Sequence, residues 1–368
     1  MTACTDDRTA GGSGAEHDLL ASARDAGLFS GAAWSIGDAD GPVRRGRLGT
    51  LSKGGTLSRD GALSRDGAPV TARTRWDLAS VTKPLVGLAV LALAERGELG
   101  LDDTIGGHLP AFRGGDRAGI TVSQLLTHTS GIAGQLPLYR DHGTREALLD
   151  ALRTVPLRTA PGTRVEYSSA GFMILGLIAE RASGADLADL VTELVTGPAG
   201  MADTGFRPPA ADRARCAATE DCPWRGHLVQ GSVHDENCAV LGGVAGHAGL
   251  FGGLADLERL GGALLNGGDG ERGRLLSAAT VAAAGRSHTD RLNLRRGLGW
   301  QCRDPHGSPV GDRLSVGSYG HTGFTGTSLW IDPDAGRYVV LLTNRVHPTR
   351  HTPGFDRIRI GFHDLAAR

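Results

Sequence analysis

Hydrophobic residues occupy almost every position of residues 76–95, WDLASVTKPLVGLAVLALAE, and no charge follows Lys83 until Glu95. A pattern this apolar predicts a buried helix rather than a surface helix, and we place its start near Ala79. Pro84 fits the first turn, where a backbone N–H has no intrahelical partner to lose. Because positions i and i+3 share a helix face, Ser80 and Lys83 are expected to lie side by side.

Other apolar patterns predict the remaining elements. Helical periodicity marks residues 16–27, 120–126, 255–265 and 353–367, and it continues through 145–189 on either side of PGTRVEYSS. Compact or alternating apolar runs predict strands at 31–36, 44–48, 297–303, 320–332 and 337–344, the last two forming a hairpin through DPDAG. Strands at both ends with helices between them predict an α/β (α+β) chain whose sheet is completed by both termini.

Three segments carry no regular pattern. Residues 1–14 are polar and are predicted to be disordered. Residues 51–69 contain SRDGAL followed by SRDGAP, a short duplication that indicates an extended hairpin tip or a mobile loop, and residues 212–250 are mostly irregular. We divide residues 15–368 into an α/β part at about 15–85 and 295–368 and an all-helical part at about 86–294.

Composition narrows the classes of partner. The formal net charge is −1 and no basic run occurs, so neither nucleic acid nor an anionic membrane is an expected partner. No apolar run reaches the roughly 20 residues of a membrane span. Five irregularly spaced cysteines fit reduced thiols better than a disulfide framework, and the polar N-terminal stretch has no apolar signal region. These features predict a cytoplasmic protein.

Ser80 and Lys83 form a Ser-x-x-Lys pattern with two interpretations. In the simpler one, Ser80 caps a helix and Lys83 is a solvated charge. The apolar surroundings argue against a surface site, and the choice of cation argues for chemistry. Only Lys53 and Lys83 are lysines among 39 basic residues. Arginine stays protonated in proteins, whereas a desolvated lysine can act as a base near neutral pH, so Lys83 points to proton transfer.

Tyr167 and His321 are two further candidates. Tyr167 precedes an apolar helix and is one of only four tyrosines. It is either a core residue with a hydrogen-bonded hydroxyl or a general acid and base near the Ser–Lys pair. His321 begins the segment HTGFTG and is either a solvent-exposed residue at a strand end or a donor to a substrate carboxylate or carbonyl. Gly323 and Gly326 would leave room for a ligand to approach this strand.

Three ordered motifs now give a specific resemblance: Ser80-Val81-Thr82-Lys83, Tyr167-Ser168-Ser169 and His321-Thr322-Gly323. They resemble the Ser-x-x-Lys, Tyr-x-Asn and Lys/His-Thr-Gly motifs of the class C β-lactamase-like serine hydrolases. That family includes penicillin-binding proteins, D-alanyl-D-alanine carboxypeptidases, esterases and acyltransferases. The flanking segments ITVSQLLTHTSGI and HDENCAVLGGVAGHAGLF are also typical of it, and the resemblance extends from about Gly27 to Asn344.

The resemblance implies a β-lactamase/transpeptidase-like fold, an antiparallel sheet flanked by helices with an all-helical insertion and the site between them. Ser80 would be the acylated nucleophile, and Lys83 and Tyr167 would move its proton. The oxyanion hole would be the backbone N–H groups of Ser80 and Phe324. Ser169, His321, Thr322 and Gly323 would contact the substrate.

One departure from the family pattern affects the substrate. Ser169 stands where the family usually has Asn, and serine has one short hydroxyl in place of an amide with both a donor group and an acceptor group. This difference, together with His321 in place of Lys, disfavours β-lactam hydrolysis and favours esters, thioesters or unusual amides.

We therefore expect a cytosolic serine acyl-transfer enzyme that acts on a small-molecule acyl donor, with water or an amine or alcohol as acceptor. A β-lactamase or D-alanyl-D-alanine carboxypeptidase is the first alternative, and a non-catalytic ligand sensor on the same fold is the second. No cofactor is expected. His234, Asp235 and His247 match no metal-ligand spacing, so no metal site is predicted. The oligomeric state, the donor and the acceptor stay open.

Overall fold

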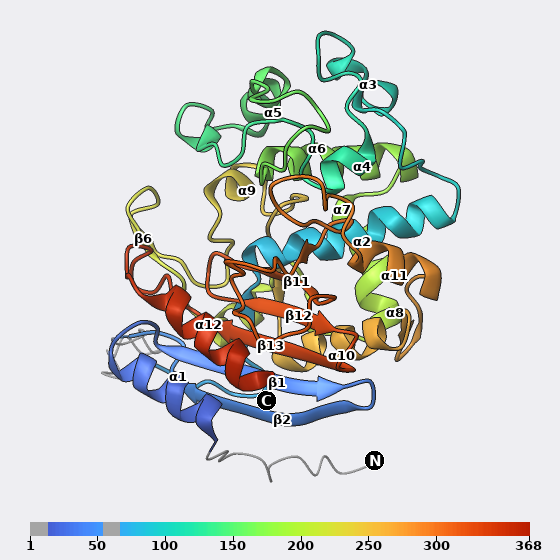
Figure 1. The fold of residues 1–368 in the computed structure, drawn as a ribbon. Coiled ribbons are helices and arrows are strands. Elements are labelled where there is room, and N and C mark those ends of the chain that lie inside the picture. Colours follow the sequence, from blue (N-terminus) through green and yellow to red (C-terminus); the bar gives the residue numbers. More distant parts are fainter. Residues whose placement is uncertain (1–13, 54–66) are drawn as a thin grey trace.

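The computed structural model describes residues 14–53 and 67–368. Residues 1–13 and 54–66 lie outside the described residues, so the predictions for the N-terminal segment and for most of the SRDG duplication fall outside them too. Figure 1 shows a sheet packed between helices on one side of the molecule and a cluster of helices on the other.

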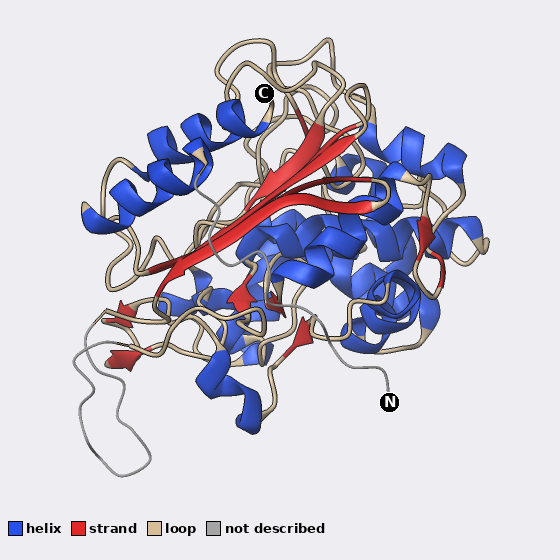
Figure 2. Cartoon of the chain, turned by 90° about the horizontal axis from the view of Figure 1, so that it is seen from below, coloured by secondary structure: helices blue, strands red, loops and turns tan. Residues whose placement is uncertain are grey.

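The main sheet has six antiparallel strands drawn from both ends of the chain. Their order is β10-β11-β12-β13-β1-β2, with bounds Gln301–Cys302, Tyr319–Thr322, Ser328–Asp332, Arg337–Thr343, Gly31–Asp38 and Gly41–Gly49. Strand β1 pairs with β13, with Ala32 opposite Thr343 and Gly37 opposite Tyr338. The prediction that both termini complete one sheet is confirmed, and Figure 2 shows the twisted sheet from below.

Two strand predictions need correction. Residues 320–332 form two strands, because a turn at residues 323–327 reverses the chain between β11 and β12, and Gly326 takes a φ of +101° in that turn. Of residues 297–303, only Gln301–Cys302 pair as a strand. The hairpin between β12 and β13 is confirmed, with Asp332 opposite Arg337.

Strand β13 is buried on both faces of the sheet. Val339 and Leu341 of β13 pack on the face covered by α1 (Ala15–Asp25) and α12 (Phe355–Ala366), while Val340 and Leu342 pack in the main core on the other face. The alternation follows the two-residue period of a strand. Helix α10 (Leu254–Leu265) contacts β1, β12 and β13. It belongs to the sheet by packing, although its residues fall in the range assigned to the helical part.

Helix α2 (Thr82–Glu95) runs through the middle of the molecule and is buried from Thr82 to Leu93, as its apolar pattern predicts. A short 3-10 turn, η1 (Ala79–Val81), precedes it. The α-helix thus begins three residues later than expected, and Ser80 lies in the 3-10 turn.

The helical part packs around α2 and α6 (Ser169–Ser183). Its other helices are α3 (Ile105–His108), α4 (Val122–Leu126), α5 (Arg145–Thr154), α7 (Leu187–Val191), α8 (Gly197–Ala199), α9 (Glu236–Val240) and α11 (Ala278–Gly285), with short 3-10 or π turns at Pro110–Phe112, Leu138–Arg140, Thr192–Thr196 and Ala210–Arg215.

Seven short strands form three small sheets. They are β3 (Trp76–Asp77), β7 (Leu250–Gly252) and β4 (Gly205–Phe206) in one, β5 (Asp221–Cys222) with β6 (His227–Leu228), and β8 (Asp269–Gly270) with β9 (Gly273–Arg274). Across residues 14–53 and 67–368, every helix is too short or too polar to cross a membrane.

Candidate active site

Ser80, Lys83 and Tyr167 meet where the start of α2 faces the start of α6. Lys83 Nζ lies 3.0 Å from Ser80 Oγ, and the Tyr167 hydroxyl lies 2.7 Å from the same oxygen. The contact between Ser80 and Lys83 follows from their i, i+3 spacing. Tyr167 comes from 87 residues further along the chain, so its position is a product of tertiary packing. All three groups are within direct proton-transfer distance.

Lys83 is fully buried, which excludes the interpretation of a solvated charge. Its ammonium group donates to the carbonyl of His247 at 3.0 Å and lies 4.8 Å from the centroid of the Tyr167 ring. No acidic side chain forms an ion pair with it among the described residues. The lysine is therefore held by the oxygens of Ser80 and His247 and by an aromatic face, an environment that leaves Ser80 Oγ within its reach.

The backbone before Ser80 is strained, and hydrogen bonds to Asp77 hold it in place. Ala79 takes a φ of +46°, in the left-handed region that disfavours side chains other than glycine. Its N–H donates to Asp77 Oδ1 at 2.8 Å, and the other oxygen of Asp77 accepts from the backbone of His234 at 2.6 Å. Asp77 is buried, and burial raises the pKa of its carboxyl group. Sequence reasoning assigned no role to Asp77, which holds the nucleophile's turn against the His234 loop.

The turn between β11 and β12 is attached to the same backbone. Thr325 Oγ1 donates to the carbonyl of Asp77 at 2.7 Å, and Thr327 Oγ1 donates to that of Leu78 at 3.0 Å. Phe324 sits in this turn and lines the same pocket as Ser80. Its ring, 44% exposed, lies between the His234 ring and the Arg345 guanidinium. The two predicted oxyanion donors thus come from segments that are hydrogen-bonded together.

The glycines of this turn make room for hydroxyl groups of the protein's own side chains. A Cβ on Gly323 would lie 2.1 Å from Thr327 Oγ1, and a Cβ on Gly326 would lie 2.1 Å from Thr343 Oγ1. The expectation that these glycines leave room for a ligand is therefore wrong, because the chain's own hydroxyls fill the space beside both.

Ser168 and Ser169 have different surroundings. Ser168 caps α6 by accepting from the N–H of Gly171 at 3.0 Å, and its hydroxyl donates to the carbonyl of Ala133. Ser169 is the first residue of α6 and lines the pocket beside Ser80. The prediction that Ser169 faces the substrate remains open to test, and its position at the pocket is consistent with it.

His321 is buried, so it is not a solvent-exposed residue at a strand end. Burial, together with the charges of Lys83 and Arg296, lowers its pKa to about 3. The ring is therefore neutral, and Nδ1 donates to the Thr322 carbonyl at 2.8 Å, which leaves Nε2 as an acceptor. Nε2 has no partner among the described residues. The hypothesis that His321 donates to a substrate needs correction, because its one N–H is already used.

His128 and Arg296 flank Tyr167, and sequence reasoning missed both. The His128 ring lies 4.7 Å from the Tyr167 ring, and its Nδ1 accepts from the N–H of Ser168 at 3.0 Å. Burial lowers the pKa of His128 well below its usual value. The Arg296 guanidinium lies 6.0 Å from the Tyr167 centroid. His128 lies in the quoted segment THTSGI, which was the available signal, whereas Arg296 carries no local signal.

A pocket of about 280 Å³ opens at Ser80. Its lining is mixed, with polar groups from Ser169, His234, Asp235, Asn237 and Arg350 and apolar or aromatic surface from Leu136, Pro137, Tyr139 and Phe324. A cavity of this size suits a small molecule or the end of a larger one.

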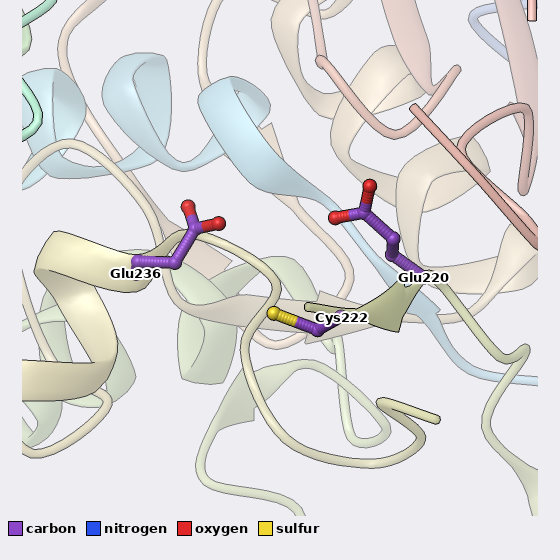
Figure 3. Close-up of side chains that lie close together, drawn as sticks. All are labelled: Glu220, Cys222 and Glu236. Carbon is purple, nitrogen blue, oxygen red and sulfur yellow. The ribbon is translucent and has the colours of Figure 1, made fainter. Parts of the chain in front are cut away.

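The acidic side chains near this pocket are already matched with cations. Glu220, Cys222 and Glu236 lie close together in Figure 3. The Arg350 guanidinium binds both carboxylates, and His234 Nε2 lies 3.1 Å from Glu220. These contacts lower the pKa of Glu220 against the effect of burial. Asp235 instead accepts from His247 Nε2 at 2.9 Å. Arginine thus occupies the place between the carboxylates that a metal ion would need.

Comparison with known proteins assigns the family. The sequence model described as "Beta-lactamase" matches residues 18–361. The chain belongs to the β-lactamase family. It is 33% identical over 308 residues to the Escherichia coli (strain K12) protein named "Putative D-alanyl-D-alanine carboxypeptidase", over 75% of this chain and 70% of that one. It is therefore a serine hydrolase or acyltransferase of this family, which confirms the resemblance and the enzyme prediction.

Solved structures of the β-lactamase family share the whole fold. EstCE1, "a hydrolase with promiscuous acyltransferase activity", superposes with a TM-score of 0.74 at 24% identity, over 96% of this chain and 97% of that one. Simvastatin synthase (LovD) from Aspergillus terreus superposes with a TM-score of 0.73 at 23% identity, again over 96% and 97%. At these identities the likeness supports the predicted fold class and leaves the substrate open.

Proposed function

We propose that this protein forms a covalent acyl-enzyme on Ser80 and passes the acyl group from a small-molecule ester, thioester or amide to water or to a small alcohol or amine. The observation that carries the proposal is the convergence of Lys83 Nζ and the Tyr167 hydroxyl on Ser80 Oγ, at 3.0 and 2.7 Å. A nucleophile with two proton-transfer groups in contact is the arrangement that covalent acyl transfer requires.

The reaction has two steps, acylation of Ser80 and transfer of the acyl group to the acceptor. As Ser80 Oγ bonds to the acyl carbon, its proton passes to the Lys83–Tyr167 pair, and the carbonyl oxygen becomes an oxyanion at the backbone N–H groups of Ser80 and Phe324. The bond to the leaving group then breaks, and the pair delivers the proton to the departing alcohol, thiol or amine. In the second step the acceptor loses its proton to the same pair, and Ser80 recovers its hydroxyl. Each oxyanion donor is worth about 3 kcal/mol.

The pocket favours a donor without an essential carboxylate. His321 is neutral at physiological pH because burial keeps its pKa near 3. It therefore supplies no positive charge in the third motif, and Ser169 offers one hydroxyl in place of an amide. Both differences support activated esters and thioesters over β-lactams. The aromatic and aliphatic residues Leu136, Tyr139 and Phe324 give the pocket surface for a short acyl chain.

A second candidate is D-alanyl-D-alanine carboxypeptidase activity, which the name of the Escherichia coli relative favours.

The cytoplasmic location stays a prediction. The four cysteines within the described residues are free thiols, which is consistent with it.

Steady-state turnover of a substrate panel tests the proposal. The panel contains a p-nitrophenyl ester, an acyl thioester, a D-alanyl-D-alanine dipeptide and a penicillin, with Ser80→Ala as the negative control and Ser168→Ala as a control for damage to the start of α6. We expect ester or thioester turnover that Ser80→Ala abolishes. Turnover of the dipeptide alone would support the carboxypeptidase instead, and no turnover of any substrate would contradict the proposal.

A further inference from the structure

Arg296 is a buried arginine with no anionic partner among the described residues. It is 6% exposed, its Nε makes no hydrogen bond, and no carboxylate in the described part of the chain forms an ion pair with it. Asp304 is the one carboxylate whose charge raises the pKa of Arg296, and it accepts a hydrogen bond from the backbone of Arg295 instead. Arginine remains charged even when buried. An uncompensated buried cation is costly and needs an explanation.

The charge of Arg296 faces Tyr167. Its guanidinium lies 6.0 Å from the centroid of that ring, on a loop that also fixes the segment before Tyr167, since Asn293 exchanges hydrogen bonds with the backbone of Val165. Burial lowers the pKa of Arg296, and the largest opposing contribution comes from Tyr167.

Among residues 14–53 and 67–368, every titratable side chain in ring or cation–π contact with Tyr167 is basic. Lys83 approaches from α2, His128 from the segment after α4, His321 from β11 and Arg296 from the loop before β10. Burial and the charges of Arg296 and Lys83 lower the pKa of both histidines, so these rings stay neutral. Asp235 interacts electrostatically with Lys83, and it is hydrogen-bonded to His247.

Lys83, Arg296 and two neutral histidines therefore lie against the ring of Tyr167, whose hydroxyl is hydrogen-bonded to Ser80 Oγ. A negative charge is favoured at this place by a field that is already in position, which is the condition for electrostatic catalysis. We propose that Arg296 is a positioning residue for acyl transfer, whose buried charge stabilises the negative charge shared by Ser80 and Tyr167 when the Ser80 proton is removed. The inference rests on the proposed acyl-transfer function.

The size of the effect follows from the distance. The Arg296 guanidinium lies 6.0 Å from the centre of the Tyr167 ring, and a unit charge at about that distance, with an effective dielectric constant of roughly 20 to 40, changes a protonation equilibrium by roughly 1–2 pH units. The acidic limb of kcat/KM reports the Ser80–Lys83–Tyr167 unit as a whole. Arg296→Met removes the charge and keeps an apolar chain, so we expect this limb to move to higher pH by roughly 1–2 units, and kcat/KM below the limb to fall by roughly 10- to 100-fold.

The test compares complete pH profiles of the full chain with a p-nitrophenyl ester. Arg296→Lys keeps the charge, so its acidic limb should lie closer to that of the wild type than to that of Arg296→Met. Arg303→Met is the matched control, because Arg303 is equally buried with an unpartnered Nε but faces Asp312. A merely structural role for Arg296 would lower kcat/KM by the same factor at all pH values. An acidic limb at the same pH in Arg296→Met and wild type would overturn the proposal.

Ultraviolet titration of tyrosinate gives a second readout that needs no turnover. Burial raises the pKa of Tyr319 and Tyr338, so these two ionise last. In a Tyr139→Phe background, the transition that is lost when Tyr167→Phe is added is assigned to Tyr167. We expect Arg296→Gln, which keeps a polar side chain if the Met variant does not fold, to move that transition to higher pH. An unchanged transition would count against the proposal.

Labelling with a fluorophosphonate probe separates the two hypotheses. If the probe labels Ser80 in the wild type but Arg296→Met leaves the acidic limb of kcat/KM at the same pH, only the role of Arg296 is contradicted. Wild-type protein that is not labelled contradicts the proposed function itself.

Discussion

Mild acid should destabilise this protein through its buried histidines. His128, His321 and His363 are buried, and burial lowers the pKa of each, to about 3 for His321 and about 4 for His363. In the unfolded chain a histidine binds a proton with a pKa near ~6.5. Below that pH the unfolded chain takes up protons that the folded protein refuses, so stability is present at neutral pH and is lost as the pH falls.

The loss can be calculated from these values. At about pH 5, His321 and His363 each cost about 2 kcal/mol relative to neutral pH, about 4 kcal/mol together, and His128 and His347, whose pKa burial also lowers, act in the same direction. A domain has about 5–15 kcal/mol of stability in total. The carboxyl groups of Asp77 and Asp256 act in the opposite direction, because burial raises their pKa values and the folded protein gains protons there as the pH falls.

Urea unfolding between about pH 7.5 and pH 5 measures this dependence. His363→Gln should remove about 2 kcal/mol of the loss, because it deletes a buried histidine whose pKa in the folded protein is about 4, and His227→Gln, at an exposed histidine, is the matched control. His363 is the better target because it lies on α12, whereas the rings of His128 and His321 contact the ring of Tyr167. Equal free energies of unfolding at both ends of the pH range would refute the reasoning.

Three further changes test the site. Lys83→Arg should reduce kcat by roughly 100-fold or more, because the charge remains but the base is lost; near-normal turnover would contradict the proton-transfer role of Lys83. Asp77→Asn leaves a single oxygen for the backbone N–H groups of Ala79 and His234; we expect a loss of about 1–3 kcal/mol in thermal or urea unfolding, and unchanged stability would mean that these bonds are dispensable. Ser169→Asn should change the ratio of kcat/KM between esters and penicillins by more than it changes the melting temperature, and a constant ratio would remove Ser169 from substrate recognition.

The parts of the fold that could be predicted were those with a local signal. The apolar run of α2, the strand GAAWSI and the hairpin through DPDAG each carry a periodic pattern within one segment, and the structure has all three. The break inside residues 320–332 was missed because the turn between the two strands depends on Gly326 and on hydroxyls that bond residues 77 and 78.

The candidate site shows the same division. Ser80 and Lys83 share a helix face, so their contact could be predicted from spacing alone. Tyr167 entered only through an ordered set of motifs. Asp77, His128 and Arg296 act through distant contacts, since each becomes a part of the site only when separate segments pack together. The donor role expected of His321 failed for a similar reason: a sequence does not reveal which ring nitrogen the backbone will use.

Intact-protein mass spectrometry after rapid mixing with a p-nitrophenyl ester tests the covalent intermediate most directly. The account predicts a mass increase equal to the acyl group, located on Ser80 by peptide mapping and absent in Ser80→Ala. Faster loss of the adduct when an amine or alcohol is added would identify a transferase, and unchanged loss would identify a hydrolase. If the wild-type protein released p-nitrophenol during the first turnover and no adduct formed on Ser80, the account would be contradicted.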